Sequence, residues 1–150
     1  HGDLELPESN AIARYIDTAF DGPALVPTDP KAAAIVNRWI STVNTSVDQM
    51  LMRQYVVEYA FHKDTDGNVV RDVIDRTVKR LPKMFAFLDG AVAEGYLGGD
   101  TFSMADCFLM PILGAVQNFP EGKENFENAP NLKTYFATVA ARDSFKETAA

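Results

Sequence analysis

The stretch Gly98–Asp106, with the sequence Gly-Gly-Asp-Thr-Phe-Ser-Met-Ala-Asp, decides how the second half of the chain folds. Its two glycines and the aspartate that follows them are typical of a turn. Ser103 and Asp106 then stand three residues apart, directly before the apolar run Cys107–Met110. This spacing predicts a capping box, in which the Ser103 hydroxyl accepts from the Asp106 amide and the Asp106 carboxylate accepts from the Ser103 amide. We therefore expect a helix to begin here, and we assign Ser103 and Asp106 a structural role.

Phe102 and Cys107 flank this box at the two positions of a hydrophobic staple. Cys107 is the only cysteine in the chain, so the sequence excludes an intrachain disulfide and a multi-thiol metal site. Because Cys107 falls on the apolar side of the predicted helix, we expect its thiol to pack in the core rather than to react.

The overall composition fits one globular domain without a membrane span. The chain has 150 residues, of which 47% are hydrophobic, and no apolar run approaches the roughly 18 residues that a membrane span needs. Its formal net charge of -7 argues against nucleic acid or an anionic membrane as a partner. No signal peptide is visible, so we expect a cytoplasmic location.

The first twenty residues read differently from the rest of the chain. Leu4-Glu5-Leu6 alternates like a short edge strand. Since three residues cannot form a stable strand alone, we expect further chain to precede His1. A helix should follow Pro7, and the glycines and prolines of residues 21–30 predict a linker. The apolar residues with helical spacing are Ala11, Ile12, Tyr15, Ile16 and Ala19.

Two long amphipathic helices are expected after the linker. The first should begin at an Asp29 cap with Pro30 at its first position and run to about His62. The second should run from about Val69 to Glu94, with a kink or interruption at Pro82. The inward-facing residues are Ile35, Val36, Trp39, Ile40, Val43, Val47, Met50 and Leu51 in the first, and Val70, Val73, Ile74, Val78, Leu81, Phe85, Leu88 and Val92 in the second.

The polar turn between these two helices resembles a calcium-binding loop only in part. Asp64, Asp66 and Gly67 match the pattern. The loop would also need a ligand where His62 stands and a glutamate where Val73 stands. We therefore expect no metal site, and we interpret His62 as a solvated loop residue.

The remaining sequence predicts further helices and completes a mainly α fold. The capped helix should run from Ser103 to about Asn118 and contains Pro111. Residues 119–130 are expected to be loop, residues 131–142 helix, and Asp143 is a candidate cap for a short last turn.

Two segments together resemble the cytosolic glutathione S-transferase family. Glu8-Ser9-x-Ala11-Ile12-x-x-Tyr15-Ile16 is similar to the end of the family's thioredoxin-like domain. Tyr96-Leu97-x-Gly99-Asp100-x-Phe102-Ser103-x-Ala105-Asp106 is similar to its helical domain. The resemblance implies three parts: residues 1–20 as the last strand and helix of a thioredoxin-like α/β domain, 21–30 as a linker, and 31–150 as a helical bundle like the family's C-terminal domain.

The resemblance also implies an enzyme that conjugates or transfers glutathione to electrophilic small molecules, the chemistry of detoxification. Glutathione would be the co-substrate and a hydrophobic electrophile the second substrate. The family's catalytic Ser, Tyr or Cys and its cis-proline lie in the first part of the thioredoxin-like domain, which the 150 residues do not contain. We therefore assign no catalytic residue.

Glu8 and Ser9 are the candidate glutathione-binding residues. The start of a helix offers unpaired amides and a partial positive charge, which suit a carboxylate. The Ser9 hydroxyl adds a donor, and the Glu8 carboxylate attracts an ammonium group. The γ-glutamyl end of glutathione carries both charges. The alternative is that Ser9 simply caps its helix.

Other implied contacts involve the first long helix and a partner subunit. The family places its second-substrate cleft beside Asp48, Gln49, Met52 and Arg53, although residues at such spacing are more often core. A homodimer is implied, with Asn10 and Arg14 near the seam. A non-catalytic domain for protein association or ligand carriage is the alternative function, and a helical bundle without a ligand is a third.

Overall fold

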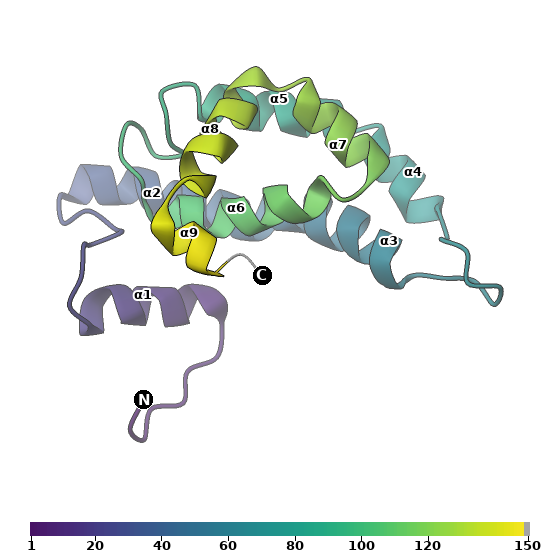
Figure 1. The fold of residues 1–150 in the computed structure, drawn as a ribbon. Coiled ribbons are helices and arrows are strands. Elements are labelled where there is room, and N and C mark those ends of the chain that lie inside the picture. The colour runs from purple at the N-terminus through teal and green to yellow at the C-terminus, as the bar shows by residue number, and fades with distance from the viewer. Residues whose placement is uncertain (149–150) are drawn as a thin grey trace.

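The computed structural model describes residues 1–148, in which the regular elements are helices and no strand forms (Figure 1). Two isolated bridges, Lys63–Val69 and Tyr96–Gly99, are the β-type pairings in this part of the chain. The helices are α1 (Ser9–Ala19), α2 (Pro30–Thr42), η1 (Val43–Val56), α3 (Val57–Phe61), α4 (Asp72–Val78), α5 (Leu81–Ala91), α6 (Met104–Val116), α7 (Pro120–Glu127), α8 (Pro130–Ala140) and α9 (Asp143–Thr148).

The first long helix is confirmed in extent, since α2, η1 and α3 follow one another without a break from Pro30 to Phe61. Its cap is also confirmed: the Asp29 carboxylate accepts from the amides of Lys31 and Ala32 at 3.1 and 2.9 Å. The middle segment η1 is a π-helix, which the sequence pattern did not predict. Val43, Val47, Leu51 and Tyr55 recur every fourth residue in η1 and are fully buried.

The second long helix is interrupted, as the proline predicted. Helix α4 ends at Val78 and α5 begins at Leu81, so that Pro82 stands at the second position of α5. A proline has no amide to donate and is therefore tolerated only in the first turn of a helix. The helix is therefore interrupted between Val78 and Leu81, which places Pro82 in the first turn of α5.

Helix α6 is the centre of the bundle. It packs against η1, α2 and α8, while α5, α7 and α8 pack on one another above it in Figure 1. Its buried residues are Met104, Ala105, Asp106, Leu109, Met110, Ile112, Leu113 and Val116. Pro111 lies on the exposed side and does not end the helix. Cys107 also lies on the exposed side of α6, so the prediction of a packed core thiol is wrong. The buried face of α6 includes its neighbour Asp106 but not Cys107.

The prediction of a loop over residues 119–130 is wrong, because this segment contains α7. Pro120 occupies its first position, and Gly122 and Phe126 are buried. A side chain at position 122 would collide with the carbonyl of Val116 and the ring of Tyr55. The residues that suggested a loop have other roles here. Pro120 begins the helix, and Gly122 lies where α7 comes close to Val116 and Tyr55.

Helix α1 stands apart from this bundle and buries none of its residues (Figure 1). Ile16 and Phe20 are each 52% exposed. The linker ties α1 to α6: the Asp17 carboxylate accepts from the amides of Leu25 and Val26 at 2.6 and 3.2 Å, and the Leu25 carbonyl accepts from the Met104 amide at 2.9 Å.

The expected strand at Leu4–Leu6 is absent. The chain instead turns at its start, with the His1 amino group donating to the Leu4 carbonyl at 2.9 Å. A strand forms only beside another strand that shares its hydrogen bonds, and residues 1–148 contain none. The mainly helical part of the fold prediction is therefore confirmed, and the strand is not.

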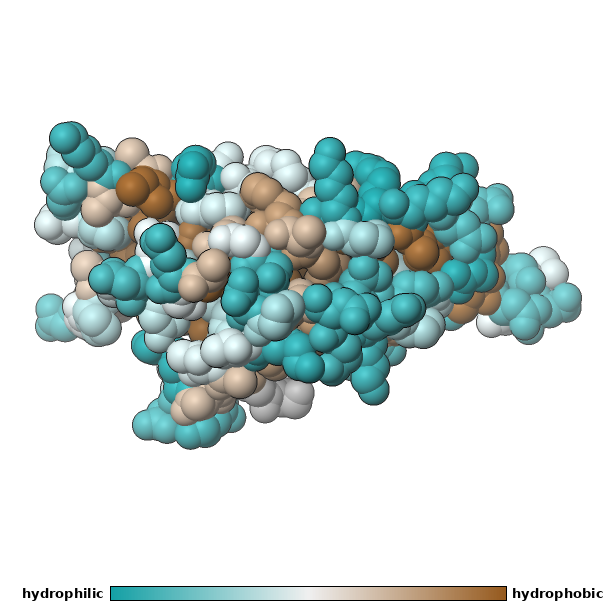
Figure 2. Space-filling model, turned by 90° about the horizontal axis from the view of Figure 1, so that it is seen from above, coloured by the Kyte–Doolittle hydropathy of each residue, from teal (hydrophilic) through white to brown (hydrophobic). Residues whose placement is uncertain are grey.

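The surface seen from above in Figure 2 is largely hydrophilic, with separate hydrophobic patches between the polar side chains. Charged residues make up 23% of the chain, close to the average for a globular domain of about 25%.

Candidate functional site

The start of helix α1 carries an unusual backbone conformation. Glu8, the residue before the first helical turn, has φ 73° and ψ 114°. Within the described chain it is the non-glycine residue with a positive φ. Side chains disfavour this region, and such strain costs about 1–3 kcal/mol. Strained residues cluster at ligand sites, so this geometry marks the segment as a candidate site.

The donors at this helix start are open. The first helical bond joins the Ile12 amide to the Glu8 carbonyl at 2.9 Å, and the amides of the first turn that precede it have no helical partner. No side chain of the described residues caps α1. Glu8 and Ser9 are both exposed. The alternative interpretation, in which Ser9 is a plain cap, therefore lacks the hydrogen bond that it requires.

Three other helix starts are filled by carboxylates from the chain itself. Asp29 caps α2, as described above. The Asp89 carboxylate, on α5, accepts from the Leu132 amide at 2.9 Å and from the Asn131 side chain at 3.1 Å, at the start of α8. The third is Asp106 at α6. Among the described residues, helix α1, like α4, α5 and α7, has no side-chain cap, and it is the one of these four that begins at a residue with a positive φ.

The capping box at α6 is present and is more extensive than the sequence suggested. Asp106 is fully buried, and its Oδ2 accepts from the Ser103 amide at 2.8 Å and the Ser103 hydroxyl at 3.0 Å. Its Oδ1 accepts from the Leu97 amide and the Tyr135 hydroxyl, both at 2.9 Å. Burial, reinforced by the neighbouring Asp106 carboxylate, raises the pKa of Tyr135. With four donors satisfied, this carboxylate has a structural role.

A second polar cluster was missed by the sequence analysis. The Glu121 carboxylate accepts from the hydroxyls of Tyr55 and Tyr59 at 3.0 and 2.7 Å, and Arg71 pairs with it at 2.6 Å. Partial burial opposes ionisation, but the bonds from Tyr59 and Arg71 outweigh it and lower the pKa of Glu121 to about 2. The Tyr55 hydroxyl also accepts from the Gly122 amide at 2.7 Å. These contacts join the start of α7 to η1 through Tyr55, to α3 through Tyr59 and to the start of α4 through Arg71.

The four residues of the predicted second-substrate cleft do not converge. Asp48 and Arg53 form an ion pair at 3.0 Å. Gln49 lines a different, small cavity between η1 and α5. Met52 is half-buried against the core. The cleft therefore remains a prediction, carried by the family resemblance alone.

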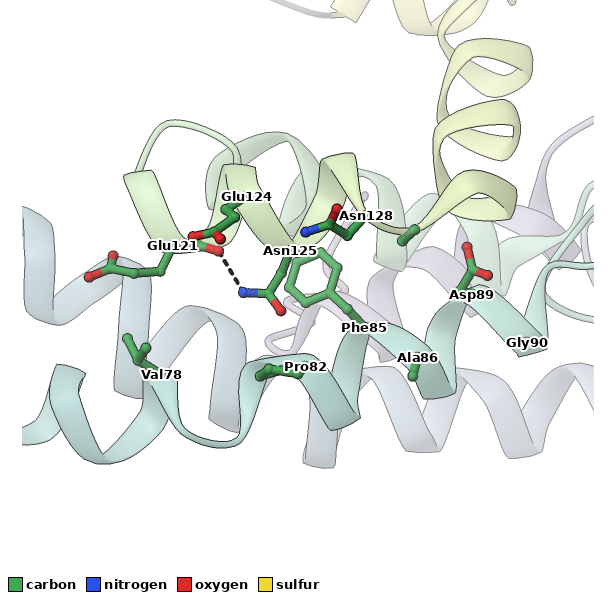
Figure 3. Close-up of a pocket in the computed structure, with 11 residues that line it drawn as sticks. Val78, Pro82, Phe85, Ala86, Asp89, Gly90, Glu121, Glu124, Asn125 and Asn128 are labelled. Atoms are coloured by element: carbon green, nitrogen blue, oxygen red, sulfur yellow. Dashed lines mark hydrogen bonds between the residues drawn. The ribbon is translucent and has the colours of Figure 1, made fainter.

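Two larger grooves lie elsewhere on the bundle. One, of about 640 Å³, lies between α5 and α7. Figure 3 shows Glu121, Glu124 and Asn125 on one side of it, facing Pro82. The Asn125 side chain donates to the Glu121 carbonyl at 2.8 Å, and the Glu121 carboxylate is already engaged.

The other groove, of about 520 Å³, lies between α6 and the C-terminal helices. Arg142 lies at one of its edges, 3.9 Å above the ring of Phe102. Cys107 contributes to its wall, and partial burial of the sulfur atom raises the pKa of this thiol, although the residue as a whole is exposed. Neither groove contains Glu8 or Ser9.

Residues 1–148 bring together no group of three His, Cys, Asp or Glu side chains that could hold a metal ion. Asp64, in the calcium-like turn, instead accepts from the amides of Asp66 and Asn68 at 2.9 and 2.8 Å. None of the helices described is long and apolar enough to cross a membrane.

Comparison with known proteins identifies relatives for almost the whole chain. Residues 49–143 match the model of the glutathione S-transferase C-terminal domain. A glutathione S-transferase from Hyoscyamus muticus is 26% identical over 152 residues, an alignment that covers 97% of this chain and 69% of that protein.

Solved structures share the fold. Glutathione transferase F7 from Populus trichocarpa superposes with a TM-score of 0.86 at 26% identity, covering 99% of this chain and 71% of that one. A glutathione S-transferase-I bound to lactoylglutathione gives a TM-score of 0.85 at 23% identity, covering 98% and 70% of the two chains. At that identity the second likeness supports the fold alone.

Proposed function

The chain belongs to the glutathione S-transferase family through that family's C-terminal domain, and we propose that the protein transfers glutathione to electrophilic small molecules. The family match and the relatives named above support this activity. Residues 1–150 supply no catalytic nucleophile to this proposal. Their contribution is to bind and orient glutathione.

The observation that carries the proposal is the open, strained start of α1. A γ-glutamyl carboxylate placed there would accept from the Ser9 hydroxyl and from the first-turn amides, and it would be favoured by the positive end of the helix. The exposed Glu8 carboxylate would attract the ammonium group of the same γ-glutamyl unit. A zwitterion with both charges on one carbon matches a hydroxyl and a carboxylate on neighbouring residues.

The same proposal divides the chain into three parts. Residues 1–20 belong to a thioredoxin-like glutathione-binding domain, residues 21–30 are the linker, and residues 31–150 are the helical domain. Support comes from the apolar face of residues 1–20, which the described chain leaves uncovered: Leu4, Leu6, Ile12 and Ile16 are between 36% and 52% exposed. The rest of such a domain would bury these side chains.

A homodimer and a cytoplasmic location complete the proposal. Asn10 and Arg14 lie near the proposed subunit seam. Arg14 donates to Asn37 on α2 at 3.0 Å, an exposed contact that joins α1 to α2 at this surface. The second substrate is a hydrophobic electrophile beside Asp48, Gln49, Met52 and Arg53.

The proposal is tested by measuring binding and turnover in one preparation of the complete protein. Calorimetric titration should show glutathione binding, and mixing with 1-chloro-2,4-dinitrobenzene should give a glutathione-dependent rise in absorbance of the conjugate. Binding without turnover would favour the ligand-carrying alternative. No binding at millimolar glutathione would overturn the proposed site.

A further inference from the structure

The groove between α5 and α7 in Figure 3 has the size of a small-molecule site and a partly apolar lining. It measures about 640 Å³, and pockets of roughly 300–1,000 Å³ bind small molecules. Its apolar lining residues are Val78, Pro82, Phe85, Ala86 and Ala129. Phe85 and Ala129 are buried. We refer to this space as the α5–α7 groove.

The α5–α7 groove is open because two lining positions of α5 carry little or no side chain. These are Ala86 and Gly90, which lie one helical turn apart. A Cβ atom added at Gly90 would meet nothing within 4 Å beyond its chain neighbours and its own helix backbone. The groove therefore has room for a ligand that lies along α5.

The charged side chains that line the groove are all carboxylates. They belong to Asp89, Glu121 and Glu124. Arg71 neutralises Glu121 at 2.6 Å, but within residues 1–148 neither Asp89 nor Glu124 takes part in an ion pair. The lining therefore keeps two negative charges that these residues do not neutralise, and it favours a cationic ligand.

The two unpaired charges lie at different levels along the groove. Figure 3 shows Glu124 towards the end near Val78 and Asp89 at the end near Gly90, with the ring of Phe85 between them. Seven residues of α5 separate Pro82 from Asp89, which corresponds to a rise of about 10 Å along the helix. This arrangement matches a linear ligand that carries a cation at each end and an apolar chain between them.

We propose that the α5–α7 groove binds an aliphatic diamine or a longer polyamine. One ammonium group donates to the Glu124 carboxylate and the other to the Asp89 carboxylate, as charge-assisted hydrogen bonds. Asn125 uses its side-chain amide nitrogen on the Glu121 carbonyl at 2.8 Å, which leaves its carboxamide oxygen as a further acceptor. The methylene chain lies against Phe85, where removal of its apolar surface from water favours binding.

This site is independent of the proposed function, because its lining contains no residue of the proposed glutathione site or second-substrate cleft. Its test uses the complete protein without glutathione. The probe is 1,5-diaminopentane, and pentylamine, which lacks the second ammonium group, is the matched control. Calorimetric titration should show that the diamine binds about three- to fivefold more tightly, the effect of one additional exposed ion pair. Equal affinities for the two amines would contradict a site with a carboxylate at each end.

Backbone amide signals of the ¹⁵N-labelled protein report where the diamine binds. Gly90, Asn125 and Ala129 line the α5–α7 groove, so the proposal predicts that their amide signals shift on titration. Because the chain carries a net charge of -7, the alternative is diffuse attraction of a cation to an acidic surface. Shifts that are spread over the exposed carboxylates, or that leave the groove unaffected, would overturn the proposal.

A matched pair of variants on α7 tests the role of charge. Glu124→Gln should weaken diamine binding about three- to fivefold, with little effect on folding, because Glu124 is exposed. Glu127→Gln makes the same charge change on the same helix outside the groove lining, and it should leave the affinity unchanged. Asp89 is kept in both variants, because its carboxylate also accepts from the Leu132 amide at the start of α8. Equal diamine affinities for the parent and Glu124→Gln would contradict the site.

Discussion

Helices α1 and α6 begin with similar residues, but these residues are exposed at α1 and buried at α6. At α6, Ser103 and Asp106 are buried, and the carboxylate accepts four hydrogen bonds from within the chain. At α1, Ser9 and Glu8 are exposed, no side chain of residues 1–148 caps the helix, and the backbone of Glu8 has a positive φ. Both starts combine a serine with a carboxylate.

The difference separates a structural helix start from a binding one. A satisfied, buried carboxylate contributes to stability and has no capacity left for a ligand. Open donors on a strained backbone contribute nothing to the isolated fold and are available to a partner. On this view, changes at α6 should alter stability, and changes at α1 should alter ligand affinity.

The largest effect should come from Asp106→Ala. It leaves the Ser103 and Leu97 amides and the hydroxyls of Ser103 and Tyr135 without their acceptor in the core. Because each buried orphan costs about 1–3 kcal/mol and some will rebond, we expect unfolding free energy to fall by about 3–5 kcal/mol. Urea unfolding measures this loss. An unfolding curve that superimposes on that of the parent would contradict the structural role of the α6 start, because the stability of the protein would then not depend on the capping box.

Glu121, at the start of α7, is a second carboxylate whose hydrogen bonds are satisfied within the chain. It should make the free energy of unfolding depend on pH. Its pKa is lowered from 4.5 to about 2 in the folded protein, so its contribution is complete above about pH 5 and is lost as the pH falls towards 2. Since Arg71 is 43% exposed, solvent screening reduces the expected contribution to about 2 kcal/mol.

The measurement compares the parent with Glu121→Gln in urea at pH 7, 5 and 3. The stability gap between the two proteins should narrow as the pH falls, because protonated glutamate and glutamine are both neutral. A gap that is constant across this range would show that the ion pair with Arg71 contributes nothing beyond hydrogen bonding.

A smaller effect, of opposite sign, should come from Glu8→Gly. Glycine adopts positive φ without the penalty of a side chain, so the substitution should raise the unfolding free energy by about 1 kcal/mol. The same substitution removes the proposed ammonium partner and should weaken glutathione binding. Thermal melting and titration of one variant check both statements. A loss of stability would show that the Glu8 side chain supports the fold.

The sequence predicted the features that depend on neighbouring residues. The caps at Asp29 and at Ser103 with Asp106 use bonds to amides two or three residues away, and the break before Pro82 follows from one missing amide. These interactions are local, so their residues appear in sequence as a fixed spacing.

Features that depend on distant residues were missed. Glu121 meets Tyr55 and Tyr59 across separations of 66 and 62 residues, which no spacing reveals. Helix α7 was hidden because Gly122 is required by the approach of Val116, a tertiary contact. The π-helical form of η1 likewise shares the apolar pattern of an ordinary helix. Of the candidate site, the sequence indicated Glu8 and Ser9, but their openness and strain are properties of the folded chain.

The central claim is tested most directly by titrating glutathione into the complete protein, Ser9→Ala and Ser103→Ala. Ser9→Ala removes one bond to a charged group, worth roughly 1.5–3 kcal/mol. Its affinity should therefore fall about ten- to a hundredfold with little change in melting temperature. Ser103→Ala should lower the melting temperature and leave the affinity of the folded protein unchanged. Equal glutathione affinities for the parent and Ser9→Ala would contradict the claim that the start of α1 is a ligand site.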